Sequence, residues 1–208
     1  MKLVVLGANG RTGRLVLQAA LARGMAVTAV VRSEDRAPDL QDARLTLAVG
    51  DPCDPAFLAS VFSGQDAVIS TLGGRWPTKT ATSVYFRSAE AVVHAASATG
   101  LKRVLVTSTT LLFPGQALLG TVLRVVVPNV VHSAVRMEDT LKLSGLDWTS
   151  ARVGFLNDDA VSEYRAKRNA LLKGGTAVPR SALAHSLIDA LDDPQTIGAA
   201  YSVAQTNT

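Results

Sequence analysis

Three glycines near the start of the chain have the spacing of a phosphate-binding turn. Gly7, Gly10 and Gly13 follow the apolar run Leu3–Leu6 and precede a helical pattern. After a strand, the first glycine permits a tight turn and the second lets the backbone approach a pyrophosphate. The third lets the helix pack closely on the strand. We therefore predict a dinucleotide site here; the alternative is a glycine-rich turn that binds no ligand.

The helix after this turn would present free backbone amides to an anion. The amides of Arg11 and Thr12, aided by the helix dipole, would hold the pyrophosphate. Asn9 lies in the same loop, and the side chain of Arg11 offers a second positive group. We predict that all three residues contact the cofactor.

Arg32 ends the second apolar run, Ala26–Val31, about 20 positions after the glycines. An acidic residue in this place accepts the ribose 2′-hydroxyl of NAD, whereas an arginine accommodates the 2′-phosphate of NADP. Arg32 and the neighbouring Ser33 therefore favour NADPH. Two alternatives stay open: a surface arginine at the end of a strand, or NAD bound through Glu34 or Asp35.

Two further loops follow predicted strands. Asp51 follows the third strand and is either an acceptor for the adenine amino group or a turn residue before Pro52. Glycines after the fourth strand let that loop pass close to the ribose and nicotinamide. From this loop we predict cofactor contacts by Thr71, Leu72 and Gly73. Arg75, which comes next, is either an anion clamp or an exposed residue.

Short apolar runs alternate with helical patterns along most of the chain. This alternation predicts an α/β single-domain Rossmann fold, a doubly wound parallel sheet with helices on both faces. At 208 residues the chain suits one domain, 1–208. The strands are expected at 3–6, 26–31, 45–49, 67–71, 103–107, 148–153 and 200–204. The helices are expected at 12–23, 55–62, 81–99, 131–143 and 182–191, with a loop through Asp158 and a variable stretch to Gly175.

Residues 109–131 interrupt this alternation with an apolar segment of no clear period. We interpret it as a substrate lid above the nicotinamide. Phe113 would face a flat hydrophobic acceptor, and Arg124 would meet an acidic substituent. The alternative is that the segment packs as ordinary core or as a dimer contact.

Composition excludes several other classes of protein. The net charge of +4 suits an anionic ligand, but no Lys/Arg run marks a nucleic-acid site, and we interpret the basic stretch 165–173 as a solvated helix face. A single cysteine and three histidines without metal spacing predict no disulfide and no metal site. The most apolar later stretch is broken by Arg124 and Pro128, and no signal peptide is evident. We expect a cytoplasmic monomer or weak homodimer without nucleic-acid or membrane partners.

Several motifs, in this order, resemble the atypical short-chain dehydrogenases of the NAD(P)H-binding or NmrA-like family. The likeness runs from Lys2 to about Val203 and is greatest to the flavin and biliverdin-IXβ reductases of that family. It implies a monomeric Rossmann protein that uses NADPH to reduce flavins or linear tetrapyrroles. The motifs are Gly-Ala-Asn-Gly-Arg-Thr-Gly, Val-Val-Arg-Ser, Gly-Asp, Gln-Asp-Ala-Val-Ile, Leu-Gly-Gly-Arg, Val-Thr-Ser-Thr and Arg-Met-Glu-Asp-Thr-Leu.

The resemblance also implies roles for residues after the fifth and sixth strands. Ser108 matches a serine beside the nicotinamide that orients the acceptor or the carboxamide, which makes it the catalytic candidate, and Thr109 follows as a cofactor contact. Arg152 and Val153 match a segment that passes near the nicotinamide. Phe155 stands where the reductases place a histidine, and the usual pair of prolines before it is absent. These departures leave the acceptor open.

The acid/base pair of ordinary short-chain dehydrogenases, Tyr-x-x-x-Lys, is missing. None of the three tyrosines, at 85, 164 and 201, is followed four residues later by a lysine. Reduction of a conjugated acceptor needs no such pair, because the cofactor carries the hydride chemistry and solvent supplies a proton. We therefore expect an NADPH-dependent reductase of a planar acceptor such as a flavin, a quinone or a linear tetrapyrrole.

Two rival functions stay open. One is a non-catalytic NmrA-like redox sensor that binds NADP(H) and signals its occupancy to a protein partner. The other is a sugar-nucleotide epimerase or dehydratase, which is disfavoured by the missing pair and by the lack of a sizeable C-terminal substrate domain. A sensor would bind cofactor yet fail to consume it with any acceptor, and this behaviour separates it from the reductase.

Overall fold

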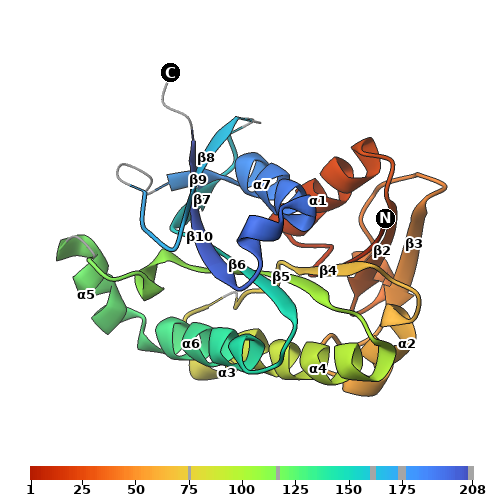
Figure 1. The fold of residues 1–208 in the computed structure, drawn as a ribbon, viewed down its shortest axis with the longest axis horizontal. Helices are drawn as coiled ribbons and strands as arrows, with labels where there is room; N and C mark the ends of the chain where they lie inside the picture. Colours follow the sequence, from red (N-terminus) through yellow and green to blue (C-terminus); the bar gives the residue numbers. More distant parts are fainter. Residues whose placement is uncertain (75, 116–117, 160–162, 173–176, 206–208) are drawn as a thin grey trace.

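A computed structural model of the chain describes residues 1–74, 76–115, 118–159, 163–172 and 177–205 (Figure 1). Its centre is a sheet with the strand order β3-β2-β1-β4-β5-β6-β10-β8. Every neighbouring pair in this sheet is parallel except β10 and β8. Its strands are β1 (Lys2–Leu6), β2 (Ala26–Val31), β3 (Leu45–Val49), β4 (Ala67–Ser70), β5 (Arg103–Thr109), β6 (Asp147–Val153), β8 (Tyr164–Arg168) and β10 (Ala199–Gln205).

Helices cover both faces of this sheet, which confirms the predicted fold class. In Figure 1, α1 and α7 lie on one face, and α2, α3, α4 and α6 lie on the other. The helices are α1 (Arg11–Ala22), α2 (Pro55–Phe62), α3 (Lys79–Thr82), α4 (Val84–Thr99), α5 (Leu118–Val126), α6 (Pro128–Lys142) and α7 (Arg180–Asp192), with 3-10 turns η1 (Glu34–Arg36), η2 (Thr110–Leu112) and η3 (Pro194–Thr196).

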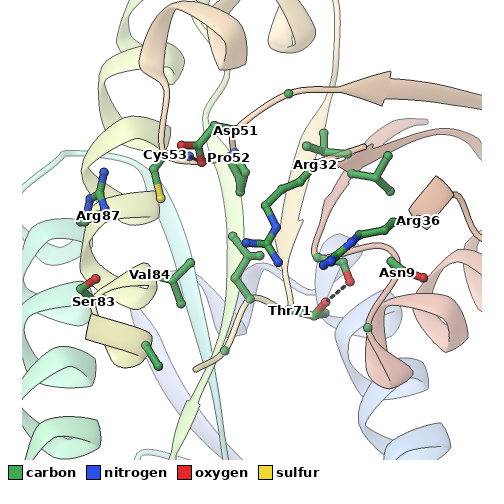
Figure 2. A pocket seen from close by; sticks show the side chains of 18 of the residues that line it. Asn9, Arg32, Arg36, Asp51, Pro52, Cys53, Thr71, Ser83, Val84 and Arg87 are labelled. Atoms are coloured by element: carbon green, nitrogen blue, oxygen red, sulfur yellow. Dashed lines mark hydrogen bonds between the residues drawn. The ribbon is translucent and has the colours of Figure 1, made fainter. Parts of the chain in front are cut away.

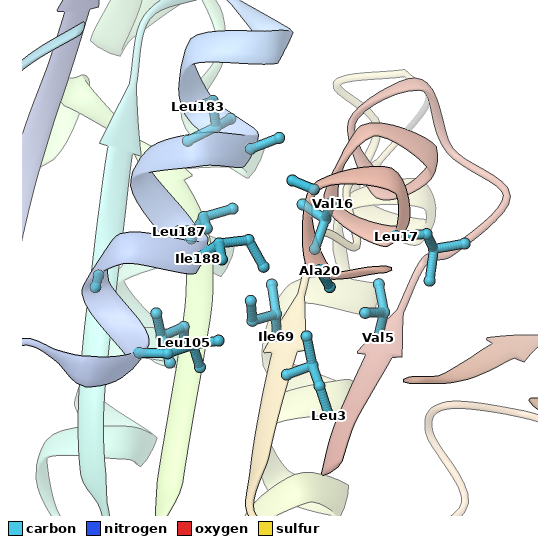
Figure 3. Close-up of a cluster of buried hydrophobic side chains, with 14 of the residues drawn as sticks. Leu3, Val5, Val16, Leu17, Ala20, Ile69, Leu105, Leu183, Leu187 and Ile188 are labelled. Atoms are coloured by element: carbon cyan, nitrogen blue, oxygen red, sulfur yellow. The ribbon is translucent and has the colours of Figure 1, made fainter. Parts of the chain in front are cut away.

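Each face of the sheet has its own apolar core. Successive side chains of a strand point to opposite faces, so Leu3 and Val5 of β1 pack towards α1 and α7. Val4 and Leu6 pack towards α2, α4 and α6. Figure 3 shows the first of these cores between the strands and the two helices. Burial on both faces explains why the strand is an uninterrupted apolar run.

The structure corrects two of the expected helical segments. The helix expected at 81–99 is divided at Ser83 into α3 and α4. The segment 109–131, for which no regular structure was expected, contains η2 and α5, and α6 begins at Pro128 rather than near Val131. Proline suits the first turn of a helix because its missing amide has no acceptor there. Within the described ranges, no helix is long and apolar enough to cross a membrane.

Two regions in which no strand was expected form strands. Residues 164–168 form the edge strand β8, so their basic side chains belong to a strand and not to a helix face. Charged side chains on an edge strand discourage pairing with other chains. The expected loop through Asp158 contains β7 (Phe155–Asn157), which pairs in parallel with β9 (Ala177–Pro179) in a second, small sheet.

Candidate functional site

A cavity of about 750 Å³ opens at the carboxyl ends of β1, β2, β3 and β4 (Figure 2). Its opposite wall comes from α3 and the start of α4. The strand order reverses between β1 and β4, and ligands of open α/β sheets bind at such a point. Eight predicted cofactor contacts line this cavity: Gly7, Asn9, Gly10, Arg32, Asp51, Thr71, Leu72 and Gly73.

The turn between β1 and α1 is tight enough to require its glycines. Gly7 has a φ of +80°, a conformation that side chains with a Cβ rarely adopt. The amide of Gly10 donates to the carbonyl of Gly7 at 2.9 Å. A Cβ on Gly13 would lie 2.1 Å from that same carbonyl oxygen, so the helix approaches the turn too closely for any other residue. Gly13 itself is buried beneath the turn.

The start of α1 has the features of an anion site. Its N-cap, Gly10, supplies no side-chain hydrogen bond to the first turn. The first-turn amides, at Arg11 and Thr12, have no acceptor within the helix. These amides and the positive end of the helix dipole lie beside the cavity, where Asn9 and Gly10 line its wall.

The side chain of Arg11 is engaged away from this cavity. Its Nη1 donates to Asp158 at 2.8 Å, and the other oxygen of Asp158 accepts from Arg180 at 2.6 Å. The contact connects the start of α1 with the start of α7. In this structure the guanidinium of Arg11 thus pairs with Asp158, and its contact with the cofactor stays a prediction.

Two arginines that sequence reasoning missed provide further positive charge at the cavity. Arg36 of η1 lines it beside Arg32, and Arg87 of α4 lines the opposite wall. Figure 2 shows Arg32 and Arg36 projecting towards each other, with Arg87 standing apart near Cys53. Arg36 follows Arg32 by four residues in the loop after β2 and could have been noticed in the sequence, whereas Arg87 lies in an ordinary helical pattern.

The loop after β3 combines a turn with a cavity wall. Oδ1 of Asp51 accepts from the amide of Cys53 at 2.9 Å, so the turn role proposed for this carboxylate is present, and Asp51 also lines the cavity. Burial raises the pKa of the Cys53 thiol, and the charge of Asp51 raises it further. Arg87 and Arg32 act against this shift. Of the two arginines, Arg87 has the larger effect on this thiol.

Tyr85 packs against the loop after β4. A Cβ on Gly73 would lie 3.3 Å from the Tyr85 hydroxyl, so the phenol lies against this glycine loop. Burial raises the pKa of Tyr85, and a hydrogen bond with the backbone of Gly74 opposes that rise less strongly. The phenol is therefore protonated at neutral pH. Arg75, the next residue, is outside the described residues.

Ser108 lies near the end of β5, outside the residues that line the cavity. Among the described residues, its Oγ is the buried side-chain polar atom without a hydrogen-bond partner. A buried hydroxyl without a hydrogen bond lowers the stability of the folded protein unless a water molecule or a ligand provides the partner. Thr109, which follows, uses its own hydroxyl to accept from the amide of Leu111 at 3.2 Å, and this contact caps η2.

Arg152 is the neighbour of Ser108 in the register of β5 and β6, and Val153 is the neighbour of Thr109. The Arg152 guanidinium donates to the fully buried Glu138 of α6, at 2.9 Å from Nε and 2.5 Å from Nη2. It also lies over the ring of Phe113, 4.5 Å from the centroid. Glu138 is a residue that sequence reasoning missed.

The predicted substrate residues do not gather at the large cavity. Phe113 is buried, and together with Arg152 it lines a separate cavity of about 420 Å³ beside Trp148. Arg124 is exposed on α5, and Phe155 is 61% exposed on β7. Ser33, a predicted cofactor contact, precedes η1 and lies beside Arg32 without lining the cavity.

Comparisons with solved structures show the same fold in proteins of low sequence identity. The anaerobilin reductase ChuY from Escherichia coli O157:H7 superposes with a TM-score of 0.81 at 23% identity, covering 100% of this chain and 98% of that chain. A short-chain dehydrogenase/reductase from Veillonella parvula, in complex with NADP, has a TM-score of 0.83 at 20% identity, covering 100% and 95%. These likenesses show a shared fold.

The sequence comparisons identify the family. The isoflavone reductase homolog IRL of Zea mays is 40% identical over an alignment 82 residues long, which covers 35% of this chain and 26% of that protein. The match thus spans about a quarter of the maize protein. The model of the family described as NAD(P)H-binding matches residues 7–194, a range that includes every residue lining the large cavity. This chain belongs to the NAD(P)H-binding family.

Proposed function

We propose that the protein is an NADPH-dependent reductase that transfers hydride to a planar acceptor such as a flavin, a quinone or a linear tetrapyrrole. One observation carries the proposal: the large cavity has the glycine turn after β1 in its wall and, beside that turn, two converging arginines, Arg32 and Arg36. A dinucleotide with an additional phosphate has that distribution of charge.

The residues fit this cofactor on two structural grounds. A Cβ on Gly7 would lie 3.0 Å from Oγ1 of Thr71 and 3.2 Å from the amide nitrogen of Leu72, so this glycine lets the turn and the loop after β4 meet closely in the cavity wall. The partnerless hydroxyl of Ser108 can donate to or accept from a bound molecule. When bound, NADPH supplies a hydride. The chain's own part is to hold the pyrophosphate at the first turn of α1 and the 2′-phosphate at Arg32 and Arg36, and to position the reacting groups.

The preference for NADPH over NADH rests on Arg32 and Arg36. Within the described chain neither guanidinium has an ion pair with a carboxylate, so both are available to a phosphate. Charge-assisted hydrogen bonds contribute about 1.5–3 kcal/mol each. Arg32→Ala should therefore weaken NADPH binding at least tenfold and leave NADH binding nearly unchanged.

Fluorescence titration of both cofactors measures this difference. Arg168→Ala is the matched control, because Arg168 is an exposed arginine of β8 that donates to the carbonyl of Gln195, away from the cavity. Equal losses for NADPH and NADH in Arg32→Ala would show that Arg32 does not bind the 2′-phosphate.

The acceptor class rests on the missing acid/base pair and on similar proteins. Tyr85 is followed four residues later by Ala89 and not by a lysine. The described site therefore offers no Tyr/Lys pair to protonate a carbonyl or deprotonate an alcohol. Reduction of a flavin or a linear tetrapyrrole needs no such pair, because the cofactor carries the hydride chemistry and solvent can supply the proton. The anaerobilin reductase and the isoflavone reductase homolog are both reductases by name, which agrees with this direction of hydride transfer.

Rapid mixing of the NADPH-loaded protein with FMN, a quinone or biliverdin tests the reaction. Loss of NADPH absorbance together with reduction of the acceptor supports a reductase. A redox sensor is the second candidate, because α5 exposes Leu118, Val125 and Val126 to solvent where a partner would bind. Tight binding without loss of NADPH for every acceptor would favour the sensor.

A further inference from the structure

We propose that Arg87 is the adenine-binding residue of this site: its guanidinium stacks on the base and contributes equally to the binding of NADPH and NADH. The proposal rests on the cofactor site proposed above. It separates the three arginines of the cavity into two functions, with Arg32 and Arg36 assigned to the phosphate and Arg87 to the base.

Arg87 occupies a different end of the cavity from the other two arginines. It lies one turn after Val84 on the same face of α4, and both residues line the wall opposite β2. Figure 2 shows Arg87 beside Cys53, while Arg32 and Arg36 project together from the other wall. Phosphate groups favour converging cations, and Arg87 does not converge with this pair.

The charge of Arg87 acts at the loop after β3. Both Arg87 and Arg32 oppose the raised pKa of the Cys53 thiol, and Arg87 has the larger effect. The charge of Arg87 therefore interacts more strongly with the Cys53 thiol than the charge of Arg32 does. This result agrees with the arrangement of the two side chains in Figure 2.

The surroundings of Arg87 have the chemistry of a purine site. Pro52, which is buried, and Val84 provide apolar surface for the face of a ring. Asp51 uses Oδ1 for the amide of Cys53, and its second oxygen can accept from the adenine amino group. A planar guanidinium stacks on aromatic faces, unlike the compact ammonium of lysine.

Nothing in the described part of the chain occupies the Arg87 guanidinium. It has no hydrogen bond or ion pair with any other side chain there, and the residue is exposed. Replacing it should therefore leave the folded state intact. A change in ligand affinity would then report the contact itself.

Calorimetric titration of Arg87→Ala with NADPH, NADH, 5′-AMP, 2′,5′-ADP and reduced nicotinamide mononucleotide tests the proposal. We expect a loss of about 3- to 30-fold for the four adenine nucleotides, by a common factor, and no change for the mononucleotide, which lacks adenine. Arg87→Lys should recover little, because it keeps the charge without the plane. Lys102→Ala, which removes an exposed cation elsewhere, should match the wild type in every titration.

Three results would overturn the proposal. A loss confined to NADPH and 2′,5′-ADP, or full recovery in Arg87→Lys, would make Arg87 a phosphate ligand. Unchanged affinities in Arg87→Ala would show that Arg87 makes no contact. Failure of the proposed cofactor site is recognised separately, since the wild-type protein would then bind none of the four adenine nucleotides. Equal melting temperatures of the variant and wild type exclude a folding defect.

Discussion

Glu138 holds Arg152 by two hydrogen bonds, of 2.9 and 2.5 Å, and Arg152 is the strand neighbour of Ser108. The carboxylate also accepts from Ser150 at 2.8 Å, so each of its oxygens has a donor. Because Glu138 is fully buried, these donors replace the water that the charge has lost. The pair connects α6 to the strand ends next to the candidate catalytic serine.

Removal of Glu138 should destabilise the protein strongly. Glu138→Ala leaves the largely buried Arg152 without its counter-charge, and we expect the free energy of unfolding to fall by about 3–5 kcal/mol in urea denaturation. Glu90→Ala is the control, because its pair with Arg136 is half exposed and should contribute less than about 1 kcal/mol. Similar losses in both variants would contradict a buried pair.

Ser108→Ala should separate stability from function. Its hydroxyl has no partner in the described structure, so the cofactor-free variant should be as stable as the wild type or more stable by about 1 kcal/mol. Turnover with NADPH should fall. Ser150→Ala, whose hydroxyl donates to Glu138, should instead lower the free energy of unfolding. If Ser108→Ala destabilised the free protein to the same extent, the hydroxyl would have a structural partner.

The site residues that could be identified from the sequence are those whose role depends only on their near neighbours in the chain. Gly7 and Gly13 follow an apolar strand at fixed spacing, and the strand, turn and helix they predict are all present. The residues that were missed depend on contacts distant in sequence. Glu138 meets Arg152 only because α6 packs beside β6, and Arg87 reaches the cavity only through the placement of α4.

Two elements escaped the sequence analysis for reasons of composition. β8 carries Arg165, Lys167 and Arg168, and charge on an edge strand hides the alternation by which a strand is recognised. α5 has Thr121 and Arg124 on one face, but it is short and its apolar residues Leu118 and Val125 are exposed, so the apolar side of its pattern does not mark a buried face. In both cases solvent exposure, which the sequence does not specify, decided the residue types.

Thiol labelling of Cys53 should report occupancy of the cavity. It is the protein's one cysteine and lines the cavity beside Asp51. Burial and the charge of Asp51 raise the pKa of its thiol, so the reactive thiolate is scarce at neutral pH. The rate of labelling by a maleimide should therefore keep rising with pH above the point at which the labelling rate of free glutathione levels off. Saturating 2′,5′-ADP should slow the reaction. Equal rates with and without the nucleotide would place the ligand elsewhere.

Asp189 should contribute stability that is lost in acid. Burial alone would raise the pKa of Asp189, but hydrogen bonds from Tyr164 and Arg23 outweigh burial and leave the pKa below its usual value. A lowered folded-state pKa adds stability above the unfolded value of about 3.9, and this stability disappears as the pH falls through the folded value.

Urea denaturation at pH 6 and pH 3 measures this contribution. The wild type should lose more stability between the two than Asp189→Asn, which cannot ionise. Tyr164→Phe, which removes one of the two donors, should lie between them. Identical pH dependence in all three proteins would contradict the shift.

Steady-state oxidation of NADPH and NADH by the purified protein, with FMN, FAD, a small quinone and biliverdin in turn, tests the central claim most directly. The proposed function predicts consumption with at least one acceptor and a kcat/KM for NADPH at least tenfold above that for NADH. Tight NADPH binding without consumption for any acceptor would contradict the reductase, and a preference for NADH would contradict the role of Arg32 and Arg36.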